Sequence, residues 1–204
     1  MNKDTIFNFG KSILKLLKES ILILFSSYRR DIIHAIRKAK EDGVSSYMNN
    51  YDRKHAKIAI QELIANADSE VILLCHRLSR DIYEDEGTIA ALNKFFSKDA
   101  SKKRMEVFVR DAHYEDSLFV DALNYWGVTI HKDVKKKLKN DKSGDICYVD
   151  GHILRIESDS VARKGTLCFS GNKRTIGCRR ELSDYISEAN ALKDSVLKKK
   201  DLKK

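Results

Sequence analysis

Polar side chains able to transfer protons or form hydrogen bonds gather in and beside one stretch of the chain, residues 145–172. The set comprises two carboxylates, two hydroxyls and one amide: Asp145, Asp150, Ser143, Ser170 and Asn172. A serine hydroxyl becomes a nucleophile only when a neighbouring base takes its proton, and these five positions hold no imidazole or ammonium group. The chemistry they offer is hydrogen bonding, and we expect Asp150, Ser170 and Asn172 to bond one another as a scaffold.

The elements that must position these groups are short strands joined by a tight turn. In the first strand, Ile146 and Tyr148 lie on one face and Cys147 and Val149 on the other, because side chains alternate along a strand. An Asp-Gly pair at 150–151 separates this strand from a second alternating run. Such a pair favours a hairpin with positive φ, so we predict a β-hairpin at this position.

Helices and strands alternate upstream of the hairpin. The apolar pattern predicts helices over 52–67 and 87–96, strands over 71–75 and 105–109, then a helix ending at Gly127 and a short strand reaching His131. The run over 71–75 is continuously apolar, as in a strand covered on both faces. Tyr125 and Trp126 close an amphipathic helix, which favours core packing over stacking on nucleic-acid bases.

The same residues resemble the phospholipase D superfamily, whose motif is HxKxxxxD followed by a G/S-x-x-N element. If Asp150 takes the place of the family's Asp, Ser143 stands where the family has His and Asp145 where it has Lys, while residues 170–172 (SGN) stand at the later element. The helix-strand opening over 57–79 resembles that family as well, and the likeness spans roughly residues 55–192. It implies an α/β fold with a mixed sheet flanked by helices.

The resemblance also implies a reaction, phosphodiester hydrolysis, that this chain is not expected to catalyse. Members of that family hydrolyse phosphodiesters through a phosphohistidine and combine one motif from each of two halves, so a single half would have to dimerise. Since Ser143 and Asp145 replace the histidine and the lysine, we expect a noncatalytic homodimer. Its catalysis would come from a protein partner within a larger bacterial or mobile-element system, and we expect no cofactor and no metal.

Two alternatives place chemistry elsewhere. In an active nuclease, His76, His131 or His152 would replace the missing nucleophile, and Glu157 or Asp159 would assist with a metal. A zinc site would draw on Cys75, Cys147 and Cys168 together with His76. Because consecutive strand residues point to opposite faces, Cys75 and His76 do not readily bind one ion, and core packing is the favoured interpretation of the cysteines.

Positive charge indicates the partner. The formal net charge is +9, and basic residues cluster before and after the hairpin. We predict that these residues bind nucleic-acid phosphates of DNA or RNA: Lys135, Lys136, Lys137, Lys139, Arg163, Lys164, Lys173, Arg174, Arg179 and Arg180. An acidic protein, an anionic lipid or simple solubility is the competing interpretation of the charge.

The ends of the chain differ from its middle. We expect an amphipathic helical appendage over 1–50, the α/β domain over 51–192 and a basic tail over 193–204. The apolar stripe within 1–40 would pack on the domain, pair in a dimer, or lie on a membrane surface through residues 11–30. We interpret 43–50, which is rich in Gly, Ser and Asn, as a connector.

The compartment is predicted to be the cytoplasm. The four cysteines show no CxxC spacing, and three of them lie in apolar strand runs, which is typical of reduced, buried thiols. The apolar run over 20–27 is too short to span a membrane, which needs about 20 apolar residues.

Overall fold

A single mixed β-sheet organises the protein. The computed structural model describes residues 26–97, 99–111, 117–132 and 144–170, and within these ranges seven strands form one sheet in the order β1-β7-β6-β5-β2-β3-β4. The strands are β1 (Ser46–Asn50), β2 (Glu70–Cys75), β3 (Arg104–Val109), β4 (Thr129–His131), β5 (Ile146–Val149), β6 (Ile153–Asp159) and β7 (Lys164–Phe169). Strands β2, β3 and β4 are parallel, and every other neighbouring pair is antiparallel. The predicted α/β class with a mixed sheet is confirmed.

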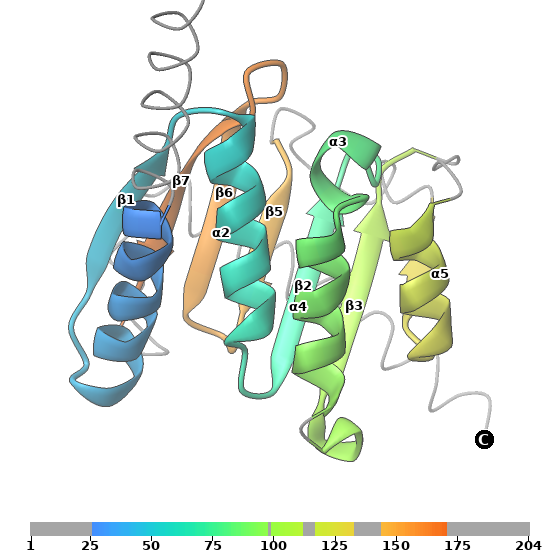
Figure 1. Ribbon diagram of the computed structural model, residues 1–204, viewed down its shortest axis with the longest axis horizontal. Helices are drawn as coiled ribbons and strands as arrows, with labels where there is room; N and C mark the ends of the chain where they lie inside the picture. Colours follow the sequence, from blue (N-terminus) through green and yellow to red (C-terminus); the bar gives the residue numbers. More distant parts are fainter. Residues whose placement is uncertain (1–25, 98, 112–116, 133–143, 171–204) are drawn as a thin grey trace, which may run out of the picture.

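The described helices pack on one face of this sheet (Figure 1). They are a helix over 26–41, α2 (Arg53–Ala65), α3 (Arg80–Tyr83), α4 (Glu86–Ser97), α5 (Leu118–Tyr125) and the short 3-10 helix η1 (Ala100–Lys102). The side chains of Asp52 and Ser117 cap α2 and α5 by accepting backbone N–H bonds, which fixes where these helices begin. The predicted helices over 52–67 and 87–96 are confirmed to within a few residues.

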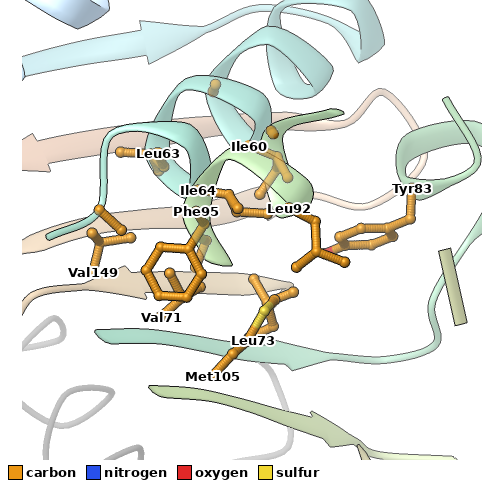
Figure 2. Packing of buried hydrophobic residues seen from close by; sticks show 14 of the residues in the cluster. Ile60, Leu63, Ile64, Val71, Leu73, Tyr83, Leu92, Phe95, Met105 and Val149 are labelled. Atoms are coloured by element: carbon orange, nitrogen blue, oxygen red, sulfur yellow. The ribbon is translucent and has the colours of Figure 1, made fainter. Parts of the chain in front are cut away.

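The core forms between these helices and the sheet. Val71 and Leu73 of β2 lie under Ile64 of α2 and Leu92 of α4, and all four are fully buried (Figure 2). The apolar residues of α2 recur at three- and four-residue spacing and therefore share one face of the helix. Burial of this face, rather than helix propensity alone, holds α2 on the sheet.

The predicted hairpin is confirmed. Strands β5 and β6 pair in register from Ile146↔Ile156 to Val149↔Ile153, and the turn residues Asp150 and Gly151 have φ of 51° and 79°. Cys147 and Val149 join the core under the helices, while Ile146 and Tyr148 lie on the other face of the sheet. The turn therefore holds the register that the alternation of side chains requires.

Residues 26–50 contribute to the same core and sheet. In the helix over 26–41, Tyr28, Ile32 and Ile36 are buried in the core. Interpreting 43–50 as a connector was wrong, because Ser46–Asn50 is strand β1 and pairs antiparallel with β7. Its partner lies more than a hundred residues away along the chain, so local composition did not reveal the pairing. The predicted contributions of residues 1–25, including most of the proposed membrane-surface segment, lie outside the described residues.

Two further predictions can be compared with the fold. Trp126 is partly buried, stacks on Phe96 at 5.2 Å and donates its Nε1–H to Asn93 at 2.8 Å, in agreement with core packing. Tyr125 is 80% exposed, so its predicted core position was wrong; it is the last residue of α5, where its ring faces solvent. Among the described helices, none is both long and apolar enough to cross a membrane.

Candidate functional site

Several charged side chains converge where β2 and β3 end, at Cys75 and Val109. We call this end of the sheet the carboxyl edge, and the end where β2 begins the amino edge. Asp145 immediately precedes the antiparallel strand β5 and therefore lies at the carboxyl edge. Its Oδ1 accepts the backbone N–H of His76 at 2.7 Å. Open α/β sheets commonly bind ligands at this edge, which makes it the first place to look for a site.

Asp145 is a buried carboxyl group among arginines. It is 5% exposed, and its oxygens lie 4.0 Å from Arg110 Nη1 and 3.9 Å from Arg163 Nη1. Burial raises the pKa of Asp145, although the His76 N–H and the nearby guanidinium groups act in the opposite direction. The position at which the resemblance implies a lysine thus holds a carboxylate enclosed by the fold.

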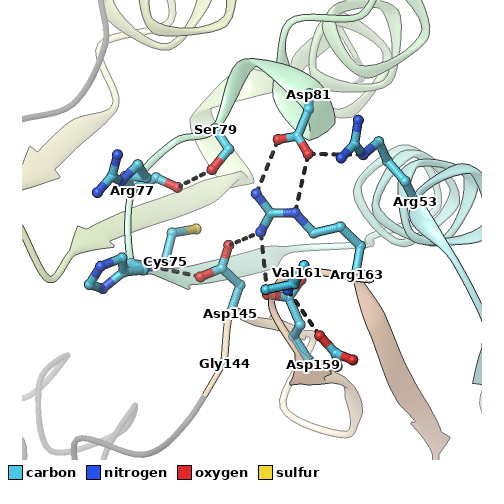
Figure 3. Close-up of polar contacts among 12 residues, drawn as sticks. Arg53, Cys75, Arg77, Ser79, Asp81, Gly144, Asp145, Asp159, Val161 and Arg163 are labelled. Atoms are coloured by element: carbon cyan, nitrogen blue, oxygen red, sulfur yellow. Dashed lines mark hydrogen bonds and ion pairs between the residues drawn. The ribbon is translucent and has the colours of Figure 1, made fainter.

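A network of ion pairs fills the space beside Asp145 (Figure 3). Arg163 contacts Glu157 at 3.3 Å and forms a bidentate ion pair with Asp81 through hydrogen bonds of 3.1 and 3.2 Å. Arg155 lies 3.5 Å from Glu157 and donates to Asn50 Oδ1 at 3.1 Å. We call Asp81, Asp145, Arg155, Glu157 and Arg163 the edge network. Its members come from α3, the approach to β5, β6 and the β6–β7 turn, so only the folded sheet assembles it.

Arg163 was predicted to bind phosphate, and its surroundings make that role unsuitable. Its side chain is 13% exposed, and its guanidinium group faces carboxylates from three different parts of the chain. Burial works to lower the pKa of Arg163, but the Asp81 hydrogen bonds and the neighbouring carboxylates raise it overall. A guanidinium held in this way serves the fold, since a phosphate would have to displace its internal partners.

Of the residual motif residues, Asp145 lies at the carboxyl edge, whereas Asp150 and Ser170 lie at the amino edge; that Asp150, Ser170 and Asn172 bond one another stays a prediction. Asp150 lies at the amino edge, at the other end of β5 from Asp145. Its carboxylate accepts the backbone N–H groups of Asp68, Ser69 and Glu70 at 2.8 to 3.0 Å. Ser170 also lies at the amino edge, where its N–H donates to His152 O. Asp150 therefore clamps the start of β2, while Ser143 and Asn172 lie outside the described residues.

The contacts of the Asp150 carboxylate lower its pKa. Burial works to raise the pKa of Asp150, but the hydrogen bonds from the three N–H groups and the charge of Lys40 together lower it below its ordinary value. Lys40 Nζ lies 3.2 Å from Asp150 Oδ2 and ties the helix over 26–41 to the clamp. Asp150 is therefore ionised in the folded protein at neutral pH.

The histidines considered for an active nuclease are dispersed. His76 is exposed at the carboxyl edge, 3.5 Å from Asp111. His131 contacts Glu106 at 2.8 Å on the face opposite the helices, and His152 is buried at the amino edge. Of the proposed metal-assisting residues, Glu157 belongs to the edge network.

The other proposed metal-assisting residue and the cysteines form no centre with those histidines. Asp159 caps a turn by accepting the N–H groups of residues 161 and 162. Cys75 and Cys147 lie in the core under the helices, and Cys168 lies on the other face of the sheet. Within the described ranges, no group of three or more His, Cys, Asp or Glu side chains is arranged to hold a metal ion.

The excess positive charge lies outside the described part of the chain. Of the 39 Lys and Arg residues, 19 fall in the described ranges together with 19 of the 30 Asp and Glu residues, so this part is formally neutral. The other 20 basic and 11 acidic residues carry the whole net charge of +9. Of the predicted phosphate contacts, only Arg163 and the exposed Lys164 are described.

The described residues on either side of the lysine-rich segment 133–143 lie at the carboxyl edge. Lys132 follows β4, which runs parallel to β3, and Gly144 leads into β5, so these two flanking residues both lie at this edge. Lys135, Lys136, Lys137 and Lys139 belong to that segment and lie outside the described residues. The described chain ends at Ser170, at the amino edge, before Lys173, Arg174, Arg179 and Arg180, which are also outside the described residues.

Three exposed arginines that sequence reasoning missed surround the edge network. Arg53, Arg77 and Arg80 have side-chain exposures of 59%, 55% and 56%, and each lies within 3.1 to 3.6 Å of one carboxylate. Arg77 and Arg80 follow directly after β2, and that position after a buried strand was the available signal. Arg53 begins α2 and reaches the edge only through the packing of that helix.

Comparisons with known proteins place limits on identity. No family model and no curated protein matches the chain. Among solved structures, it is similar to TrmBL2, an archaeal chromatin protein that shows a novel mode of DNA binding, with 11% identity and a TM-score of 0.45 over 92% of this chain and 66% of that one. It is also similar to NucT from Helicobacter pylori, with 13% identity and a TM-score of 0.45 over 72% of this chain and 96% of that one. Likenesses at this level assign neither a family nor a function.

Proposed function

We propose that this protein is a noncatalytic, phospholipase-D-like module that binds nucleic-acid phosphates, of DNA or RNA, at the carboxyl edge of its sheet. The observation that carries the noncatalytic part is Asp145. Where the resemblance implies a lysine facing phosphate, a buried carboxylate receives the His76 N–H and is enclosed by arginines. A carboxyl group enclosed by the fold cannot supply the positive charge with which a lysine would stabilise a phosphate.

The edge network also leaves no group prepared to attack phosphorus. Glu157 is buried between Arg155 and Arg163, so it is held as an ion-pair partner and not as a base. His76 is exposed beside Asp111, His131 contacts Glu106 on the face opposite the helices, and His152 lies at the amino edge. General-base catalysis needs a base within hydrogen-bond reach of its nucleophile, and the described edge brings no such pair together.

The proposal of phosphate binding rests on the lysines that lie between β4 and β5 in the sequence. The segment 133–143 carries five lysines and two aspartates and is attached at both ends to the carboxyl edge. A phosphate polymer bound there would release condensed counterions, which makes affinity fall steeply with salt. The formally neutral described part would then act as the scaffold that presents this segment.

The test is a fluorescence-anisotropy titration of the full chain against labelled DNA and RNA across a salt series. The double variant Lys135→Ala/Lys137→Ala should weaken binding and reduce the salt slope by about 0.7 to 0.9 for each lost contact. Its matched control is Lys94→Ala/Lys102→Ala, which removes two exposed lysines near the amino edge. Equal effects of the two variants would contradict the placement of the site. Gel analysis of the same samples should show uncut nucleic acid with and without divalent metal.

The proposal extends to assembly. We infer a homodimer and a protein partner that supplies catalysis, because a single module without a nucleophile can only bring a nucleic acid to another active site. One chain has a mass of 23.4 kDa, and light scattering of the purified full chain should give twice that mass. A monomer at micromolar concentration would remove the dimer from the proposal and leave the binding function intact.

A further inference from the structure

An exposed aromatic ring stands at the carboxyl edge. Tyr51 is 64% exposed and follows β1 directly. Asn50, the last residue of β1, donates its side-chain amide to the backbone oxygen of Arg163 at 2.5 Å, which fixes Tyr51 beside the edge network. The Tyr51 ring meets His55 edge-on, with centroids 6.0 Å apart and planes at 89°. His55 in turn packs edge-on against the buried Tyr28 at 4.5 Å, so the ring has a fixed support.

Exposed guanidinium groups accompany this ring along the edge. Arg53, two residues after Tyr51, shares the carboxylate of Asp81 with Arg163. On the other side of the edge network lies Arg77, as Figure 3 shows. Together with Arg80, these residues form what we call the edge rim, namely Tyr51, Arg53, Arg77 and Arg80. The rim thus combines one aromatic face with three guanidinium groups around a buried centre.

The rim arginines differ from the buried ones in how easily they exchange partners. Each is more than half exposed, and the carboxylates they pair with, Asp81, Glu84 and Asp111, are 28 to 32% exposed. Ion pairs this accessible to water contribute little to stability, so a phosphate can take the place of the carboxylate at small cost. Arginine also binds phosphate with two parallel hydrogen bonds.

We propose that the edge rim binds single-stranded nucleic acid, with one base stacked on Tyr51 and the neighbouring phosphates bound by Arg53, Arg77 and Arg80. This inference rests on the proposed function and specifies its ligand. A base exposes its face for stacking on a side chain when it is unpaired, whereas in a duplex both faces are covered by neighbouring bases.

The experiment compares wild-type full chain with matched variants, using labelled 20-nucleotide single-stranded and duplex DNA in anisotropy titrations. Tyr51→Ala should weaken binding of the single strand on the order of tenfold, while Tyr51→Phe, which keeps the ring, should bind as the wild type does. The control is Tyr125→Ala, which removes an even more exposed aromatic next to the amino edge. Arg53→Gln should lower the salt slope for the single strand by about 0.7, and Arg37→Gln, an exposed arginine on the helix over 26–41, should leave it unchanged.

The outcomes separate this inference from the function on which it rests. If the wild type binds nucleic acid with a steep salt dependence but Tyr51→Ala behaves like Tyr125→Ala, the rim is overturned and the proposed function stands. A duplex bound more tightly than the single strand would likewise overturn the rim alone. If the wild type binds neither form of DNA at low salt, and binds no RNA in the titration described above, the proposed function fails, and the rim fails with it. Circular dichroism spectra of all variants should match the wild type, because every substituted side chain is exposed.

Discussion

The clamp at Asp150 is expected to be the most sensitive polar contact of the fold. The variant Asp150→Asn removes the negative charge but keeps a side chain that tolerates the positive φ of 51° at this position. It therefore tests the carboxylate without disturbing the turn. The carboxylate accepts three backbone N–H groups and faces Lys40 at 3.2 Å, and it is almost completely buried.

The size of the effect follows from these contacts. A hydrogen bond to a charged group contributes about 1.5–3 kcal/mol, and contributions at one group are not additive. An asparagine keeps one acceptor oxygen but turns an amide N–H₂ toward donors, so we expect the free energy of unfolding to fall by about 2–4 kcal/mol. Urea denaturation of the full chain, followed by circular dichroism, measures this change. The control Asp159→Asn removes a carboxylate that also accepts two N–H groups but is exposed, and its effect should be much smaller.

The pH dependence gives a second test of the clamp. Because the folded pKa of Asp150 is lowered, its ionised form stabilises the folded state at pH values above the unfolded pKa of about 3.9. This stabilisation is lost as pH falls through the folded pKa. The stability difference between wild type and Asp150→Asn should therefore be full at pH 7 and shrink below about pH 4. A difference that is small at pH 7, or that persists unchanged at pH 2, would refute this reasoning.

Two other expectations concern buried groups. Asp145→Lys restores the residue type implied by the resemblance. It should lower the free energy of unfolding by about 3–5 kcal/mol and give no nuclease activity, because the ammonium would be buried against arginines. Asp145→Asn is the matched control, and a stable, nuclease-active Asp145→Lys would contradict the noncatalytic interpretation. Three thiols, Cys75, Cys147 and Cys168, are at most 2% exposed, and burial raises the pKa of Cys147 to about 12. In the native protein they should therefore react with a disulfide reagent only as fast as the protein unfolds. Rapid labelling of any of them, identified by mass spectrometry, would show that the core opens.

Elements specified by local pattern were predictable from the sequence. The Asp-Gly turn at 150–151 and the apolar run of β2 appear where the pattern placed them, because a tight turn and a doubly covered strand each depend on a few adjacent residues. The burial of Tyr28 and Ile32 likewise follows from helical spacing. These features need no knowledge of distant parts of the chain.

Features that depend on long-range pairing were not predictable in the same way. Strand β1 is polar, with Ser and Asn residues, and its place in the sheet comes from pairing Ser46 with Phe169. The pairing of Arg163 with Asp81 joins residues 82 positions apart, so a basic residue counted as a phosphate contact proved to be internal. Nor does sequence show that Asp145 and Asp150 lie at opposite ends of β5, since the distance between them depends on the strand being extended.

Locating the positive charge required both the sequence and the structure. The sequence shows the net charge of +9, but a total cannot say which part of the molecule carries it. The structure describes a formally neutral scaffold whose carboxyl edge holds both attachment points of the lysine-rich segment 133–143. The proposed binding through that segment would depend on ionic strength far more than on the geometry of the scaffold.

The central claim is that this protein binds nucleic-acid phosphates without cleaving them, and the salt dependence of binding by the full chain tests it most directly. The observed association constant should fall linearly on a log–log plot against salt, with a slope of about −2 or steeper, as expected for three or more phosphate contacts on a single strand. The nucleic acid recovered from the titration should be intact. Absence of binding at low salt, or an affinity insensitive to salt, would contradict the claim and assign the positive charge to another partner.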